Sequence, residues 1–99
     1  MKENERSEIK IGKHVAFRLI GDEVVIVDSR SSEMLTLNST ASVIWMHVTR
    51  GMPRDEIADV LAAEFDVTHG EALEDIAAFI ENMISRGLIL KPDPLPEAL

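Results

Sequence analysis

The sequence predicts an α+β domain in which a three-stranded antiparallel meander precedes three helices. Apolar residues alternate along residues 15–20, and Gly21-Asp22, a dipeptide suited to a tight hairpin turn, follows directly. Beyond Asn38 the apolar period changes from two residues to about 3.6, and helix-capping residues stand where the helical patterns begin. These observations place the sheet first and the helices after it.

Three strands are predicted before Asn38. Residues 15–20 form the first, and Gly21 supplies the positive φ that a primed hairpin turn needs. The second strand, residues 23–28, is apolar on both faces, which is typical of a central strand covered on each side. A polar turn over residues 29–32 leads to the third strand, residues 33–37. We expect that strand to lie antiparallel to the second, at an edge of the sheet.

The first two helices have clear start and stop signals. Asn38 and Ser39 can each cap the first helix, because their side-chain oxygens accept from unpaired amides of the first turn. Gly51 ends that helix, where a left-handed conformation is needed. Pro53 begins the second helix and suits its first position, because the missing amide would be unpaired there anyway.

The third helix is predicted over residues 68–86, from a Thr68–Glu71 capping box to Gly87, with a short extended segment at 88–90. Its apolar arc spans about 160°, wider than the ~100° that packing on one core requires. The arc divides into two stripes: Leu73, Ala77, Ile80 and Ile84 form the first, and Ala72, Ile76, Phe79 and Met83 form the second.

Two interpretations fit so wide an apolar arc. The helix is either wedged between two parts of its own domain, or one stripe seals the core and the second lines an open groove. An edge strand beside such a groove can accept an extended peptide by β-augmentation. The first interpretation of the acidic residues of this helix is that they face solvent. The second is that they form a rim that attracts basic side chains.

The charge and composition exclude several classes of function. Eighteen acidic residues outnumber ten basic ones, for a net charge of −8, so the nucleic-acid backbone is an unfavourable partner. Acidity also disfavours anionic membrane surfaces. The absence of cysteine excludes disulfides, thiolate metal sites and a thiol nucleophile. A neutral or basic peptide, or another protein, is the favoured partner.

No motif for catalysis, cofactor binding or metal binding is present. His14, His47 and His69 fall in separate elements and lack the spacing of a helical metal pair. Acid and base pairs, phosphate-binding loops and nucleophile motifs are also missing. We therefore expect a protein that is not an enzyme, with no cofactor and no metal.

The chain is predicted to be one domain with two extended ends. Residues 1–11 form a charged, flexible N-terminal segment, residues 12–90 the folded domain, and residues 91–99 a flexible proline-rich tail. No apolar run approaches the ~20 residues of a membrane span, and the N-terminus lacks a signal-peptide core. A cytoplasmic location is the expectation.

Several short fragments occur in a characteristic order between residues 12 and 90. They are Leu37-Asn38-Ser39-Thr40-Ala41, Ile44-Trp45, Gly51, Ile57-Ala58-Asp59-Val60-Leu61 before Phe65, and Ile84-Ser85-Arg86-Gly87-Leu88-Ile89. With these fragments in this order, the chain resembles the PqqD family of small winged helix-turn-helix proteins, which are also called RiPP recognition elements. The resemblance implies a non-catalytic chaperone that binds the leader of a ribosomally made, post-translationally modified peptide precursor. It also implies delivery to a modifying enzyme, such as a radical SAM protein or a leader peptidase.

The resemblance places the leader against the third strand and the third helix, the same elements that the apolar pattern singled out. The expected peptide-binding residues are Glu33, Met34, Leu35, Thr36, Leu37, Ala72, Asp75, Ile76, Phe79, Ile80 and Met83. Met52 stands at the cap of the second helix, where many relatives carry Thr or Ser, so that helix start is expected to fray. Biosynthesis of pyrroloquinoline quinone (PQQ) or of a lasso peptide are two candidate pathways.

Two other functions remain open at this point. A DNA-binding winged helix regulator shares the topology, but its recognition helix needs basic and amide side chains toward the major groove. The third helix offers Arg86 as its only base. A structural subunit that dimerises through the open edge and the second stripe is the other alternative, because such surfaces favour self-association. The expected state is a monomer or a weak homodimer.

Overall fold

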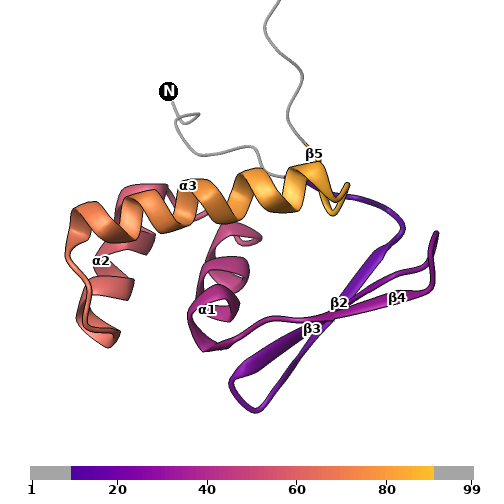
Figure 1. Ribbon diagram of the computed structural model, residues 1–99, viewed down its shortest axis with the longest axis horizontal. Coiled ribbons are helices and arrows are strands. Elements are labelled where there is room, and N and C mark those ends of the chain that lie inside the picture. Colours follow the sequence, from indigo (N-terminus) through magenta and orange to yellow (C-terminus); the bar gives the residue numbers. More distant parts are fainter. Residues whose placement is uncertain (1–9, 91–99) are drawn as a thin grey trace, which may run out of the picture.

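A computed structural model describes residues 10–90, and the predictions for residues 1–9 and 91–99 lie outside that range. The predicted α+β order is confirmed, because a three-stranded antiparallel sheet is followed by three helices (Figure 1). The elements are β1 (Lys10–Ile11), β2 (Val15–Ile20), β3 (Glu23–Asp28), β4 (Glu33–Thr36), α1 (Ser39–Val48), α2 (Arg54–Glu64), α3 (His69–Ser85) and β5 (Ile89–Leu90).

The main sheet has the strand order β2-β3-β4, so β3 is central and β4 is an edge strand, as predicted. β2 and β3 are joined by a two-residue turn in which Gly21 has a φ of 66°, the conformation that its position required. The turn between β3 and β4 contains Ser32, which has a φ of 61° without being glycine. The amide of Ser32 donates to the carbonyl of Asp28 at 2.8 Å, and this bond holds the turn closed.

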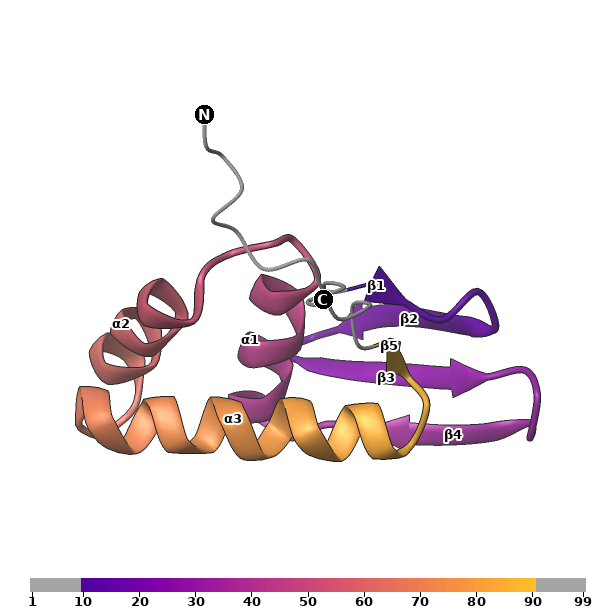
Figure 2. The same ribbon diagram turned by 90° about the horizontal axis from the view of Figure 1, so that it is seen from above.

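A second small sheet joins the two ends of the described chain (Figure 2). β1 pairs antiparallel with β5, with Lys10 opposite Leu90 and Ile11 opposite Ile89. Lys10 and Ile11 were expected in the flexible N-terminal segment, and the structure places them in this pairing instead. Ile89 is buried, so the predicted extended segment after α3 is anchored in the core. Pairing between segments this far apart has no local signal in the sequence.

The three helices pack on each other, and α1 packs on one face of the main sheet (Figure 1). α2 packs against α3, and α1 lies between them and β3. Trp45 of α1 is fully buried and contacts Phe17 of β2 edge to face, with ring centroids 5.3 Å apart. The buried core consists of Val24, Ile26, Leu37, Ile44, Trp45, Val48, Ile57, Ala58, Leu61, Ala72, Ile76, Ile80, Met83, Leu88 and Ile89.

The helix starts agree with the predictions at α1 and α3 but not at α2. The Asn38 side chain accepts from the amide of Ala41 at 2.8 Å, and Thr68 and Glu71 form the predicted capping box. At α2, Pro53 is the N-cap residue itself and not the first helical residue, and no side chain caps this helix. The cap expected at Met52 is therefore wrong, and two amides of the first turn bond to the Pro53 carbonyl instead.

A buried serine hydroxyl connects the sheet to α1. Leu37 and Val24 continue the register of β4 and β3, and the Leu37 amide donates to the Val24 carbonyl at 2.8 Å. The reciprocal ladder bond is replaced by a relay: the Val24 amide donates to Ser42 Oγ at 2.8 Å, and Ser42 Oγ donates to the Leu37 carbonyl at 3.2 Å. The hydroxyl thus satisfies a buried donor and a buried acceptor where β4 ends and α1 begins.

Replacing Ser42 with alanine should destabilise the protein by about 1–3 kcal/mol, because a buried amide and a buried carbonyl lose their partner. The measurement is the free energy of unfolding from urea denaturation. Ser39→Ala is the control, because the Ser39 hydroxyl donates to Asp22 Oδ2 at an exposed position. Its effect should stay within about 0.5 kcal/mol. Equal stability of the two variants would mean that the strands close and form the direct bond.

Candidate peptide-binding site

The outer edge of β4 carries backbone groups that face away from β3. Because the Leu37 amide points to β3, alternation along the strand turns the amide and carbonyl of Leu35 to β3 as well. The amides and carbonyls of Met34 and Thr36 then point to the open edge. β4 is the last strand in the sheet order, so this edge offers two donors and two acceptors to an added strand.

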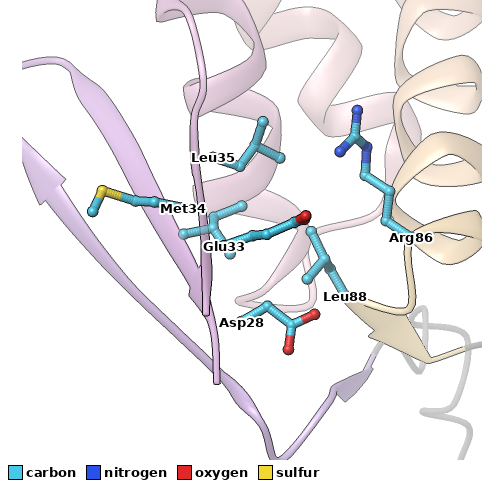
Figure 3. Close-up of a pocket in the computed structure, with 7 residues that line it drawn as sticks. Asp28, Glu33, Met34, Leu35, Arg86 and Leu88 are labelled. Atoms are coloured by element: carbon cyan, nitrogen blue, oxygen red, sulfur yellow. The ribbon is translucent and has the colours of Figure 1, made fainter. Parts of the chain in front are cut away.

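The side chains of β4 divide between the two faces of the sheet. Leu37 is buried and Leu35 half-buried on the helix side, whereas Met34 is 69% exposed on the other face. Figure 3 shows Met34 pointing away from the space between β4 and the end of α3, and Leu35 lying toward it. A peptide on this edge therefore has alternate side chains directed toward α3.

A small pocket lies between β4 and the C-terminal end of α3 (Figure 3). Its volume is about 70 Å³, and it has room for a small aliphatic side chain. Apolar side chains form its floor, while acidic groups and Arg86 provide its polar rim. The lining residues are Ile26, Asp28, Glu33, Met34, Leu35, Arg86 and Leu88.

A wider and shallower hollow, of about 340 Å³, continues along α3 toward its middle. Asn82 lines this hollow, and its side chain accepts a hydrogen bond of 3.0 Å from Arg86 Nε, which lines the small pocket. The two depressions therefore lie on neighbouring turns of α3, the small pocket against β4 and the hollow against the start of α1, and together we call them the groove. The hollow is lined by Asn38, Thr40, Ala41, Ile44, Asp75, Ala78, Phe79 and Asn82.

The structure divides the predicted helix residues between core and groove. Ala72, Ile76, Ile80 and Met83 are each no more than 3% exposed and belong to the core. Only Phe79, which is half-buried, and Asp75, which is exposed, line the groove. Three of the four members of the second stripe are thus buried, because α1 and α2 cover the centre of the apolar arc and leave only its flank open.

Sequence reasoning did not assign Ala78 and Asn82 to the groove, and considered Arg86 only as a base for DNA. These three residues follow Asp75 at spacings of three and four, so they mark one helical face next to the apolar arc. A mixed face with alanine, asparagine and arginine looks like ordinary solvated surface in the sequence. Only the proximity of β4 makes it one wall of a groove.

The turn between β3 and β4 is tied to the end of α3. Asp28 and Arg30 form an ion pair at 3.1 Å, and the side-chain hydrogen bonds from Arg30 hold the pKa of the Asp28 carboxyl below its usual value. The Arg30 guanidinium also lies against Gly87, where an added Cβ would come within 2.8 Å of Nη2. Gly87 has a φ of 76°, a left-handed conformation that favours glycine, whereas an added Cβ would displace only the flexible end of Arg30.

The three histidines lie apart from one another, and each contacts a different group. His14 Nε2 lies 3.0 Å from the Gly87 carbonyl, and His47 Nδ1 lies 2.8 Å from the Val43 carbonyl. His69 Nε2 lies 3.4 Å from Asp59 Oδ1, between α3 and α2. Within residues 10–90 no group of histidine and acidic side chains is arranged to hold a metal ion. None of the helices in that range is long and apolar enough to cross a membrane.

A small α+β domain with an open edge strand beside a helix-lined groove has the form of domains that take up an extended peptide by strand addition. Residues 23–89 match the family described as coenzyme PQQ synthesis protein D (PqqD). The chain belongs to the PqqD family. No curated protein sequence matches the chain.

Two solved structures are similar in fold and sequence. One is lasso peptide synthetase B1 complexed with the leader peptide, with 27% identity and a TM-score of 0.79 over 86% of this chain and 100% of that chain. The other is TbiB1 in complex with the TbiA(beta) leader peptide, with 26% identity and a TM-score of 0.75 over 86% of this chain and 99% of that one. Both contain a leader peptide.

Arg30→Ala should raise the pKa of Asp28 toward its usual value, because the hydrogen bonds that favour the carboxylate are lost. A depressed pKa adds stability above about pH 4 that is lost as the pH falls through the folded-state pKa. The stability gap between wild type and variant should therefore narrow in acid. Carboxyl NMR titration and urea midpoints at neutral and acidic pH measure both effects. Identical titration of Asp28 in the two proteins would contradict the assignment.

Proposed function

We propose that this protein binds the leader of a ribosomally made, post-translationally modified peptide precursor along the open edge of β4. The observation that carries the proposal is the juxtaposition of that edge with the groove on α3. Membership of the PqqD family and the leader-bound state of two similar solved structures support it. PQQ and lasso peptide precursors are the candidate substrates.

Main-chain pairing alone is too weak to account for useful affinity. The edge of β4 offers four backbone groups, and at about 1 kcal/mol net per hydrogen bond they supply roughly 4 kcal/mol. A micromolar complex needs about 8 kcal/mol. The rest must come from apolar side chains of the leader in the groove, at about 25 cal/mol per Å² buried. Pairing thus gives register and about half of the affinity, and the groove gives the other half and the specificity.

The electrostatics of the groove favour a leader of mixed charge. Asp75 lines its middle and Arg86 the end nearest the start of β4. A basic leader side chain suits the position beside Asp75, and an acidic one suits the position beside Arg86. The protein itself acts as a non-catalytic chaperone in this proposal. It presents the precursor to a modifying enzyme such as a radical SAM protein or a leader peptidase.

DNA binding is the weaker alternative. The exposed residues of α3 include Glu71, Glu74, Asp75 and Glu81; the helix contains no arginine or lysine, and Arg86 is its C-cap residue. A recognition helix with this charge would repel the phosphate backbone on either side of the major groove. No feature of the described residues favours it over peptide binding.

Met34→Pro tests the main-chain part of the proposal. The Met34 amide faces the open edge. Proline at this position therefore removes a β4 donor that the bound leader would use, and it leaves the hydrogen bonds between β4 and β3 intact. The variant should fold but bind the leader about tenfold more weakly or worse. Met34→Ala keeps the amide and should bind nearly as wild type does.

The probe for this comparison is the leader segment of the precursor encoded beside this gene, titrated by isothermal calorimetry and amide NMR. Shifts should concentrate at residues 33–37 and 75–86. A folded Met34→Pro variant with unchanged affinity would rule out strand addition on this edge. Saturable shifts confined to another surface would move the site there.

Phe79→Asp tests the groove. A charge at this half-buried position should weaken leader binding by about tenfold or more and leave the far-UV CD spectrum nearly unchanged. Leu73→Asp is the matched control, because Leu73 is also half-buried on α3 but does not line the groove. Unfolding of Phe79→Asp alone would assign Phe79 to the core. Equal loss of binding in both folded variants would show that the groove assignment is wrong.

A further inference from the structure

The face of the main sheet that is turned away from the helices carries an exposed apolar row. Ala16, Val27 and Met34 lie opposite one another across β2, β3 and β4 and point to this face. Val27 is 38% and Met34 69% exposed, and Ile20, at 58%, lies on the same face further along β2. α1, the helix that contacts β3, packs on the opposite face, where Trp45 meets Phe17.

The outer side of β3 is exposed although its residues are apolar. An antiparallel sheet with one solvated face places polar residues on that face. β3 instead directs Val25 and Val27 outward, while Val24 and Ile26 face the core. The sequence predicted that this strand is covered on each side, and within the described residues that prediction is wrong for the outer side. No element between residues 10 and 90 covers the outer side.

The outer face is too small for a second copy of this chain to cover it in a stable dimer. Three strands spaced about 4.8 Å apart, with about 3.3 Å per residue, make a face of roughly 14 Å by 20 Å, or about 300 Å². A stable interface needs about 800 Å² from each partner. Two chains with a net charge of −8 also repel each other. The face needs a partner that gains further contacts elsewhere.

A bound leader supplies part of those further contacts. A strand added to β4 widens the sheet by about 4.8 Å, and every second leader side chain then continues the rows of Met34 and Thr36 on the outer face. A protein that contacts this widened face touches the domain and the leader together. The protein that must approach the bound precursor in this way is the enzyme that acts on it.

We infer that the outer face of the sheet is the docking surface for the enzyme that processes the bound precursor, and that the leader completes this surface. The inference rests on the proposed function. The partner surface has an apolar centre to cover Val27 and Met34, and a carboxylate placed for Arg18, which lies on the same face next to Val25. Leader and enzyme bind cooperatively because each contributes contact area to the other.

Val27→Asp tests this inference, with Ala63→Asp on the exposed side of α2 as the matched control. Val27 lies on the central strand, away from the leader edge, so both variants should fold and bind the leader with wild-type affinity. The second probe is the purified processing enzyme encoded beside the precursor gene, with affinity measured by surface plasmon resonance. Saturating leader should tighten enzyme binding by about tenfold for wild type and Ala63→Asp, but not for Val27→Asp.

Each outcome separates the two proposals. Wild-type enzyme affinity in a folded, leader-binding Val27→Asp variant overturns the docking inference and leaves the leader proposal standing. Failure of the wild-type protein to bind leader overturns the proposed function itself. A concentration-dependent dimer in sedimentation that Val27→Asp abolishes would assign the face to a second copy and overturn the enzyme docking.

Discussion

The hydroxyl of Ser42 stands between the Val24 amide and the Leu37 carbonyl, and the arrangement of sheet and helices depends on this relay. Without this hydroxyl the two buried groups would lose their partner, at a cost of about 1–3 kcal/mol in stability. The relay lets the chain leave β4 and enter α1 within two residues, because α1 itself supplies the bond that the strand no longer makes. α1 is thereby held against the central strand of the sheet, and its indole ring packs in the core.

The position of α1 then determines which part of α3 is open. α1 and α2 cover the middle of the apolar arc of α3, where Ile76 and Ile80 are buried. The flank that carries Phe79 and Asn82 stays accessible and faces the start of α1, next to the pocket that Arg86 lines against β4. At the far end, Gly87 lets the chain turn back close to Arg30, so the groove is bounded by the turn between β3 and β4. The groove is therefore a consequence of core packing, and no separate element builds it.

Two surfaces of β4 remain unpaired, and they have different chemistry. Its edge offers main-chain donors and acceptors, which recognise an extended chain with little regard to sequence. Its outer face offers apolar side chains, which favour another folded surface. A short edge strand of four residues limits nonspecific pairing with other chains, because few backbone groups are available. The domain is thus suited to holding one extended segment between its own helix and a second protein.

Most of the elements were predictable from the sequence, because strand alternation, glycine turns and helix caps act over a few neighbouring residues. The strand boundaries, the hairpin at Gly21 and the capping box at Thr68 all follow from such local signals. It also pointed to β4 and α3 as the elements of a peptide site. Three features appear only in the folded chain: the pairing of β1 with β5, the burial of Ile76 and Met83, and the position of Arg86 beside β4. These depend on packing between segments far apart in the chain, and an apolar residue on a helix gives no sign of which neighbour will cover it.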